Sequence, residues 1–171
     1  MAIVAPPRHE PAFNGPERSQ LEAWLDYHRA TLLVKCAGLD IEQLTTASVP
    51  PSTLTLLGLL RHMTIVEQYW FHQIFAGEDV VPAYDSPDDP DVEFNDLNSA
   101  TLEEVERNFI TACVKSREIV AGADLFSLAR AARPSTPIDL RWICVHMIEE
   151  YARHNGHADL LRQCIDGATG D

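Results

Sequence analysis

The chain has 171 residues, with 26 Asp and Glu against 13 Lys and Arg, which gives a formal net charge of −13. This length predicts one domain with a real core. The acidic excess argues against binding to nucleic acid or to an anionic membrane surface, because both partners require clustered Lys and Arg. Hydrophobic residues make up 46% of the chain, which argues against a disordered protein.

The sequence predicts a cytoplasmic protein without a membrane anchor. Residues 1–16 lack a basic region followed by a long apolar run, so no signal peptide is expected. No stretch approaches the roughly 18 apolar residues of a transmembrane helix. The cysteines are widely spaced without a CxxC pair, which favours buried, reduced thiols over a redox pair or a cysteine metal cluster; they are Cys36, Cys113, Cys144 and Cys164.

Two helices are predicted in the first half of the chain. The first covers about 16–38, where apolar residues recur at steps of three and four and Gly38 is a natural stop. The second covers about 52–76. It follows a Pro-Pro pair that cannot lie inside a helix, and Ser52 or Thr53 can cap its start.

Two further helices are predicted in the second half. One covers about 101–122 and begins with a ThrLeuGluGlu capping-box pattern, and the other covers about 138–165. No segment shows the two-residue alternation of a strand. We therefore predict an all-α protein, a four-helix bundle forming a single domain over 1–171, with 1–15 as a loosely ordered N-terminal arm.

A long acidic connection, residues 77–100, joins the second predicted helix to the third. It carries eight acidic residues and no Lys or Arg. Long connections in helical bundles are usually crossovers and often lie over functional sites. The alternative is a solvated loop without a function of its own.

The last predicted helix contains a cluster of metal-ligating residue types. His146, Glu150 and His154 are spaced by four, so they lie along one ridge of the helix, and His157 follows on the same side. Two ligands at i and i+4 can hold one metal ion rigidly. This spacing predicts that Glu150 and His154 bind a metal.

Glu150 lies beside the apolar stripe of its helix, where a carboxylate is costly unless a cation meets it. A metal ion is one such cation. The alternative is an arginine, and Arg153 and Arg61 are the candidates for a buried Glu–Arg pair.

A third ligand must come from another helix, and His62 is the best candidate because apolar residues flank it in mid-helix. His28 could add to the site, whereas His72 is better explained by packing. Three N and O ligands with an open position are typical of a catalytic metal site. Imidazole and carboxylate suit zinc, and also nickel, iron or manganese.

These residues identify a family resemblance. The sequence LeuLeuArgHisMet (59–63), after a ProProSerThrLeu helix start, is followed near the C-terminus by HisMetIleGluGluTyrAlaArgHisAsnGlyHisAlaAspLeuLeuArg (146–162). This combination resembles the DinB-like superfamily over roughly residues 19–166. The branch it is most similar to contains mycothiol S-transferases and mycothiol-dependent maleylpyruvate isomerases.

The resemblance implies a four-helix bundle that holds a divalent metal, usually zinc, on a His–Glu–His ligand set. In this sequence the matching residues are His62, Glu150 and His154. The implied activity is transfer of a low-molecular-weight thiol, such as mycothiol or bacillithiol, to an electrophile. The resemblance also implies a homodimer.

Three functional hypotheses follow from the sequence. The leading one is a metal-dependent thiol S-transferase that acts on small electrophiles, with His146 and His157 as candidates for supporting the ligands or handling protons. The second is a metal-dependent hydrolase that uses the same ligands, with water in the open position. The third is a non-catalytic helical dimer whose metal is structural or absent.

Overall fold

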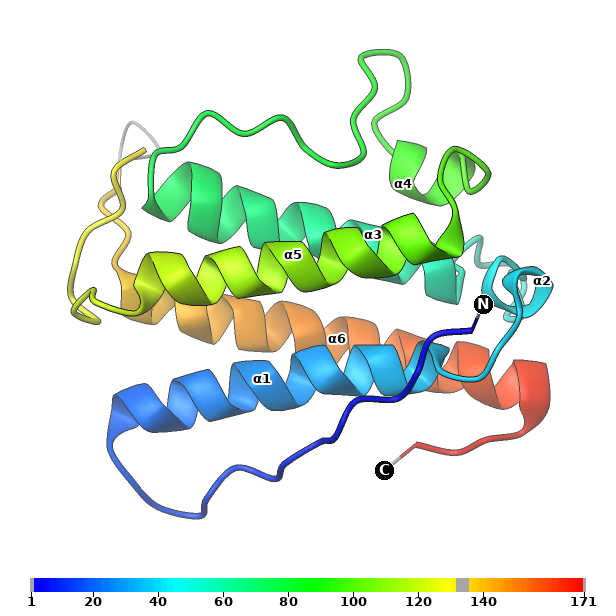
Figure 1. Ribbon diagram of the computed structural model, residues 1–171, viewed down its shortest axis with the longest axis horizontal. Coiled ribbons are helices and arrows are strands. Elements are labelled where there is room, and N and C mark those ends of the chain that lie inside the picture. Colours follow the sequence, from blue (N-terminus) through cyan, green and yellow to red (C-terminus); the bar gives the residue numbers. More distant parts are fainter. Residues whose placement is uncertain (1, 132–135, 171) are drawn as a thin grey trace.

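The computed structural model describes residues 2–131 and 136–170, and over these ranges it is all-helical apart from one isolated bridge between Leu128 and Asp139. The predicted all-α bundle is confirmed (Figure 1). Its long helices are α1 (Glu17–Cys36), α3 (Leu56–Glu67) continued by the π-helix η1 (Gln68–Phe75), α5 (Leu102–Val120) and α6 (Leu140–Asp166). Two short helices, α2 (Ile41–Leu44) and α4 (Val92–Asn95), lie in the connections.

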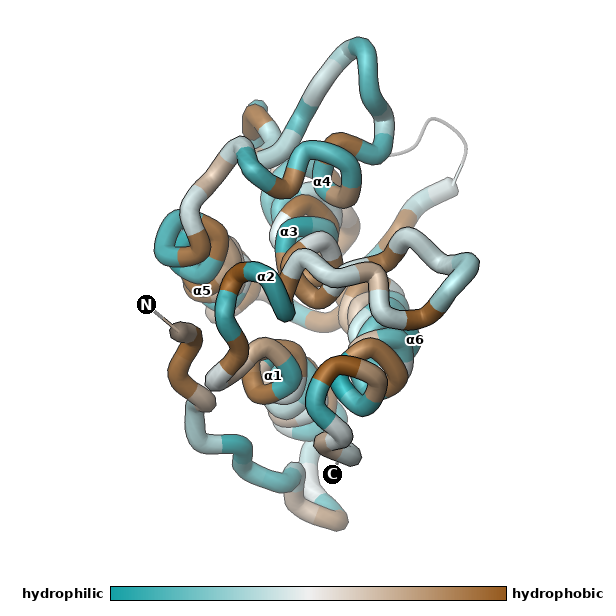
Figure 2. The backbone as a smooth tube through the Cα atoms, turned by 90° about the vertical axis from the view of Figure 1, so that its right-hand side faces the viewer, coloured by the Kyte–Doolittle hydropathy of each residue, from teal (hydrophilic) through white to brown (hydrophobic). Residues whose placement is uncertain are grey.

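The helices form an up-down-down-up bundle, in which α1 runs parallel to α6 and α3 runs parallel to α5 (Figures 1 and 2). Side chains that link α1 to α6 follow the same order along both helices. Arg141 of α6 pairs with Glu17, and further along Arg162 donates to the carbonyl oxygen of Lys35. The acidic connection returns along the length of the bundle before α5 begins, so it is the predicted crossover (Figure 1).

Local capping explains where the helices begin. Thr101 and Glu104 form the predicted capping box at the start of α5. The second long helix begins later than predicted, because Thr55, not Ser52 or Thr53, is the N-cap, and its hydroxyl accepts the Gly58 N–H at 3.0 Å. Its last two turns form the π-helix η1, where the sequence pattern had predicted continuous α-helix.

A buried ion pair lies inside the otherwise apolar core. Arg29 of α1 donates from Nε and Nη2 to the two carboxylate oxygens of Glu67, at 2.7 and 2.9 Å, and the hydroxyl of Tyr151 donates to Glu67 at 2.7 Å. Burial by itself would raise the pKa of Glu67, but the charge and hydrogen bonds of Arg29 outweigh it and lower that pKa. The buried Glu–Arg pair of this protein is therefore Glu67–Arg29 and does not involve Glu150.

Three of the four cysteines are buried, as predicted, and burial raises the pKa of Cys36 and Cys113 to about 12 and that of Cys144 to about 11. Cys164 is exposed, contrary to the prediction, because it lies on the outer face of the last turns of α6. All four thiols are free.

The N-terminal arm precedes α1 in the sequence and runs alongside it as irregular chain (Figure 1). Ile3 is buried, and its carbonyl oxygen accepts the Gly38 N–H at 3.1 Å, so this end of the arm is held against the bundle. Among the described helices, none is both long and apolar enough to cross a membrane.

Candidate functional site

The three residues predicted as metal ligands come together between α3 and α6. His62 extends from α3, and Glu150 and His154 lie one turn apart on α6. One potential ligand atom of each residue lies within 4.8 Å of those of the other two. His154 Nε2 and Glu150 Oε2 are 3.4 Å apart, and the rings of His62 and His154 have centroids 4.8 Å apart.

This group of three residues lies between the bundle core and the solvent-exposed surface. The side chains of His62, Glu150 and His154 are 26%, 22% and 13% exposed. Glu150 lies beside the apolar stripe of α6, as predicted, but its carboxylate is partly open to solvent and is not fully buried. All three side chains are therefore partly in contact with solvent.

The surroundings of His154 favour its neutral form. Burial, followed by the neighbouring His62 and His157, lowers the pKa of His154 to about 4. A neutral imidazole has a free lone pair, and this is the form that binds a metal ion. At neutral pH the His154 ring is thus unprotonated and could bind a metal ion without first losing a proton.

The acidic crossover contributes a carboxylate to the site. Glu93 of α4 is buried, and its Oε1 lies 3.1 Å from Nδ1 of His62. The ring of Phe94 packs against the ring of His62, with centroids 5.5 Å apart. The alternative of a purely solvated loop is therefore wrong for this segment. The only hint in the sequence is that apolar Val92 and Phe94 flank Glu93 within a polar stretch.

Two other histidines of the last helix contact the group of three predicted metal ligands, His62, Glu150 and His154, which is called the ligand group below. His146 Nε2 lies 3.5 Å from Glu150 Oε1, and its ring stacks on Trp142 with centroids 4.9 Å apart. His157 Nδ1 lies 3.4 Å from His154 Nδ1. Both positions agree with the supporting roles considered for these residues.

The remaining sequence candidates lie elsewhere. His28 contacts Asn155 on the α1 side of α6 and is not brought to the ligand group. His72 is buried, with Nε2 3.1 Å from the hydroxyl of Ser116, which agrees with a packing role. Arg153 forms its ion pair with Glu149, and Arg61 donates to the carbonyl oxygens of Asp96 and Val92 in the crossover.

A second group, His146, Glu149 and Glu150, also has potential ligand atoms within 4.8 Å of one another. It is a poorer metal site, because Glu149 is half-exposed and already paired with Arg153, while the His146 ring is stacked on Trp142. His62, Glu150 and His154 therefore remain the better candidate for a metal site.

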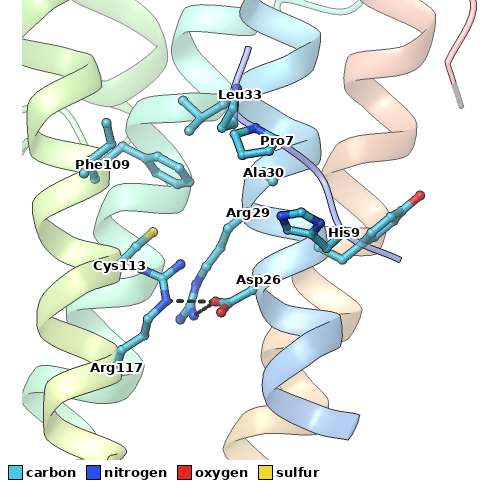
Figure 3. A pocket seen from close by; sticks show the side chains of 12 residues that line it. Pro7, His9, Asp26, Arg29, Ala30, Leu33, Phe109, Cys113 and Arg117 are labelled. Carbon is cyan, nitrogen blue, oxygen red and sulfur yellow. Dashed lines mark hydrogen bonds and ion pairs between the residues drawn. The ribbon is translucent and has the colours of Figure 1, made fainter. Parts of the chain in front are cut away.

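A cavity of about 270 Å³ opens between α1 and α5, away from the ligand group (Figure 3). Asp26 lies in its wall and accepts hydrogen bonds from Arg29 at 3.0 Å and Arg117 at 2.9 Å. The Cys113 thiol also lines it, but burial raises the pKa of this thiol to about 12, which makes it a poor nucleophile.

Comparisons with known proteins agree with the fold and identify the family. No curated protein matches the chain. The crystal structure of a conserved protein of Enterococcus faecalis superposes with a TM-score of 0.64 at 12% identity, covering 91% of this chain and 100% of that one. The mycothiol-S-transferase family matches residues 20–167. The chain therefore belongs to the mycothiol-S-transferase family of the DinB-like superfamily.

Proposed function

We propose that the protein is a divalent-metal-dependent S-transferase that joins a low-molecular-weight thiol, mycothiol or a similar thiol, to a small electrophile. The observation that carries this proposal is the meeting of His62, Glu150 and His154 between α3 and α6. The family supplies the class of thiol. The partly exposed position of the three side chains supports access for both substrates.

The ligand group fits a divalent metal in donor type and spacing. Two imidazoles and one carboxylate suit zinc best, and nickel, iron or manganese next. Ligand atoms about 2.1 Å from a tetrahedral metal are about 3.4 Å from one another. His154 Nε2 and Glu150 Oε2 have this separation. A tetrahedral ion held by these three residues alone would have its fourth position free for a substrate, as in catalytic sites.

When bound, the metal would lower the pKa of the substrate thiol and so favour its nucleophilic thiolate form. The protein's own residues set up this chemistry. Glu150 provides one negative charge that offsets part of the charge of the ion. In the reaction the sulfur forms a bond to the electrophilic carbon, the leaving group departs with its bonding pair, and the thiol proton passes to solvent.

Metal analysis combined with substitution tests this proposal. Purified wild-type protein is expected to contain close to one divalent ion per chain, whereas His62→Ala and His154→Ala lose it. His9→Ala is the control, because His9 is exposed and lies in the N-terminal arm. Retention of the ion by both variants at the ligand positions would overturn the proposed site.

Activity assays separate the transferase from its rivals. Wild-type protein should accelerate the loss of iodoacetamide above the uncatalysed reaction with mycothiol, and His62→Ala should abolish this acceleration. Hydrolysis of ester or amide panels without thiol would instead indicate a metal-dependent hydrolase. Absence of activity together with an unchanged melting temperature after chelation would indicate a non-catalytic dimer.

The setting of the reaction is also a proposal. A reduced thiol co-substrate and three buried, free cysteines suit the cytoplasm. The resemblance to the DinB-like superfamily supports a homodimer, which light scattering coupled to size-exclusion chromatography would test.

A further inference from the structure

Arg61 is a buried cation on α3 that has no carboxylate partner. The residue is 1% exposed, and none of the ion pairs in residues 2–131 and 136–170 includes it. A buried charge is costly unless hydrogen bonds or an opposite charge compensate it. The groups that compensate Arg61 therefore indicate its role.

The compensating groups all belong to the acidic crossover. Arg61 Nη1 donates to the carbonyl oxygen of Asp96. Its Nη2 donates to the carbonyl oxygen of Val92 at 3.3 Å and to the hydroxyl of Ser99 at 3.2 Å. Its Cζ lies 4.1 Å from the ring centroid of the buried Tyr84. One guanidinium group thus holds the chain on both sides of α4, which lies against α3 (Figures 1 and 2).

The next residue on α3, His62, contacts α4 itself. Its Nδ1 lies 3.1 Å from Oε1 of the buried Glu93, and its ring packs against Phe94 with centroids 5.5 Å apart. Arg61 and His62 are consecutive, so they contact neighbouring parts of one docked segment. Through these contacts, Arg61 acts on His62 by fixing where α4 lies.

Two other side chains hold the crossover, but they do so before α4 begins. Gln68 Oε1 accepts the Ala83 N–H at 2.9 Å, and Gln73 Nε2 donates to the carbonyl oxygen of Val80 at 2.8 Å. These contacts fix the first part of the crossover along α3 and η1. They leave the placement of Glu93 to the contacts around α4, of which those of Arg61 carry a full charge.

We propose that Arg61 is the positioning residue that holds α4 against the ligand group, and that docking of the crossover and metal binding at His62 strengthen each other. The docking role stands on the contacts of Arg61, and its effect on the metal rests on the proposed function. Coupling between two equilibria is reciprocal. If the docked crossover raises metal affinity, bound metal must therefore favour the docked crossover by the same factor.

Proteolysis of metal-free protein by endoproteinase Glu-C, a serine protease that cuts after glutamate, measures docking. Glu93 is buried while α4 is docked, and Glu67 is buried in the bundle core. Cleavage after Glu93 therefore reports release of the crossover, and cleavage after Glu67 reports unfolding of the bundle. Mass spectrometry identifies the sites. Arg61→Met should raise the ratio of the initial rate after Glu93 to that after Glu67 at least tenfold.

Two further variants accompany this measurement. Arg107→Met is the control, because Arg107 lines the same surface pocket as Arg61 and loses the same charge, but is exposed on α5. Its cleavage ratio should equal that of the wild type. Tyr84→Leu leaves α3 unchanged and removes the stacking partner from the crossover side, so it should raise the ratio as well. A wild-type ratio in both Arg61→Met and Tyr84→Leu would overturn the docking role.

A double-mutant cycle for zinc affinity tests the action of Arg61 through α4. Competition with a chromophoric chelator is measured for wild type, Arg61→Met, Glu93→Leu and the double variant. Arg61→Met should weaken zinc affinity about tenfold by itself and less than threefold when Glu93 is already replaced. Arg61→Lys should recover part of the loss, because it keeps the charge and a donor. Equal weakening by Arg61→Met in both backgrounds would contradict positioning through α4.

Zinc should in turn slow cleavage after Glu93 in the wild type and not in His154→Ala, which lacks a proposed ligand. Cleavage after Glu93 at the same rate with and without bound zinc would refute the coupling. The two proposals fail separately. Release of the crossover by Arg61→Met in a protein that binds no zinc would retain the docking role and refute the metal site. Zinc binding that is unchanged in Arg61→Met would refute the positioning role and leave the metal site standing.

Discussion

His62 Nδ1 and Glu93 Oε1 are 3.1 Å apart, which joins the acidic crossover to the ligand group. Since a carboxylate accepts hydrogen bonds, this contact places a ring proton of His62 on Nδ1 and leaves Nε2 as the nitrogen that could bind the proposed metal. Carboxylates commonly orient metal-binding histidines in this way. The crossover thus positions a residue of α3 for the chemistry proposed above.

Replacing Glu93 tests this positioning. Glu93→Leu should weaken metal affinity by about 10- to 100-fold, because His62 loses the acceptor that fixes its orientation. Glu93→Gln keeps an oxygen acceptor and should lose less. Asp88→Asn is the control, since it removes the same charge from an exposed position of the crossover. Competition with a chromophoric chelator measures the affinities, and equal values for Glu93→Leu and Asp88→Asn would contradict the role.

Gly58 should be needed for the docking of α4. A Cβ at this position would lie 2.6 Å from Cδ1 of Phe94, so Gly58→Ala must displace the ring that packs on His62. We expect a lower melting temperature together with weaker metal binding.

Gly156→Ala is the matched control for this substitution. Its added Cβ meets no atom within 4 Å, and the position is exposed inside α6. It should raise stability by up to about 1 kcal/mol, because alanine favours the helix. Thermal unfolding of both variants checks the pair, and equal melting temperatures would speak against a docking role for Gly58.

Glu67→Gln should destabilise the fold by about 3–5 kcal/mol, because it leaves the buried Arg29 without its main counter-charge. Urea unfolding measures this change. Asp26→Asn is the control, since Asp26 also pairs with Arg29 but has a half-exposed side chain, and its loss should cost about 1 kcal/mol or less. Similar unfolding free energies for the two variants would mean that Glu67 is not the residue that compensates Arg29.

Stability should fall in acid in two stages. Burial lowers the pKa of His72, of His28 and, to about 4, of His154, so below about pH 6.5 the unfolded chain takes up protons that the folded protein does not, and stability declines. The pKa of Glu67 is lowered by Arg29, so its contribution is complete above the usual glutamate range and is lost as the pH falls through its folded-state pKa.

Urea unfolding of metal-free protein from pH 7 down to about pH 2 measures this dependence. His72→Gln should reduce the slope of the curve just below pH 6.5, where His28 and His154 still contribute, and leave the more acidic part that depends on Glu67 unchanged. A His72→Gln curve parallel to that of the wild type throughout would show that His72 does not contribute.

The sequence by itself determined the features that depend on neighbours along the chain. Periodic apolar residues predicted the long helices, and the Thr101–Glu104 capping box lies where it was expected, because such caps involve residues three apart. The ridge that carries Glu150 and His154 followed from their spacing of four, since one helical turn brings such residues together.

Only the tertiary structure decided which residues from distant segments meet. The pairing of Glu67 with Arg29 depends on the packing of α3 against α1, and Glu67 looks like an ordinary polar residue in its own helix. Glu93 reaches His62 because the crossover folds back along α3, and no local pattern encodes that path. Contacts of this kind depend on how each helix is rotated and placed against the others, which is settled by packing of the whole core.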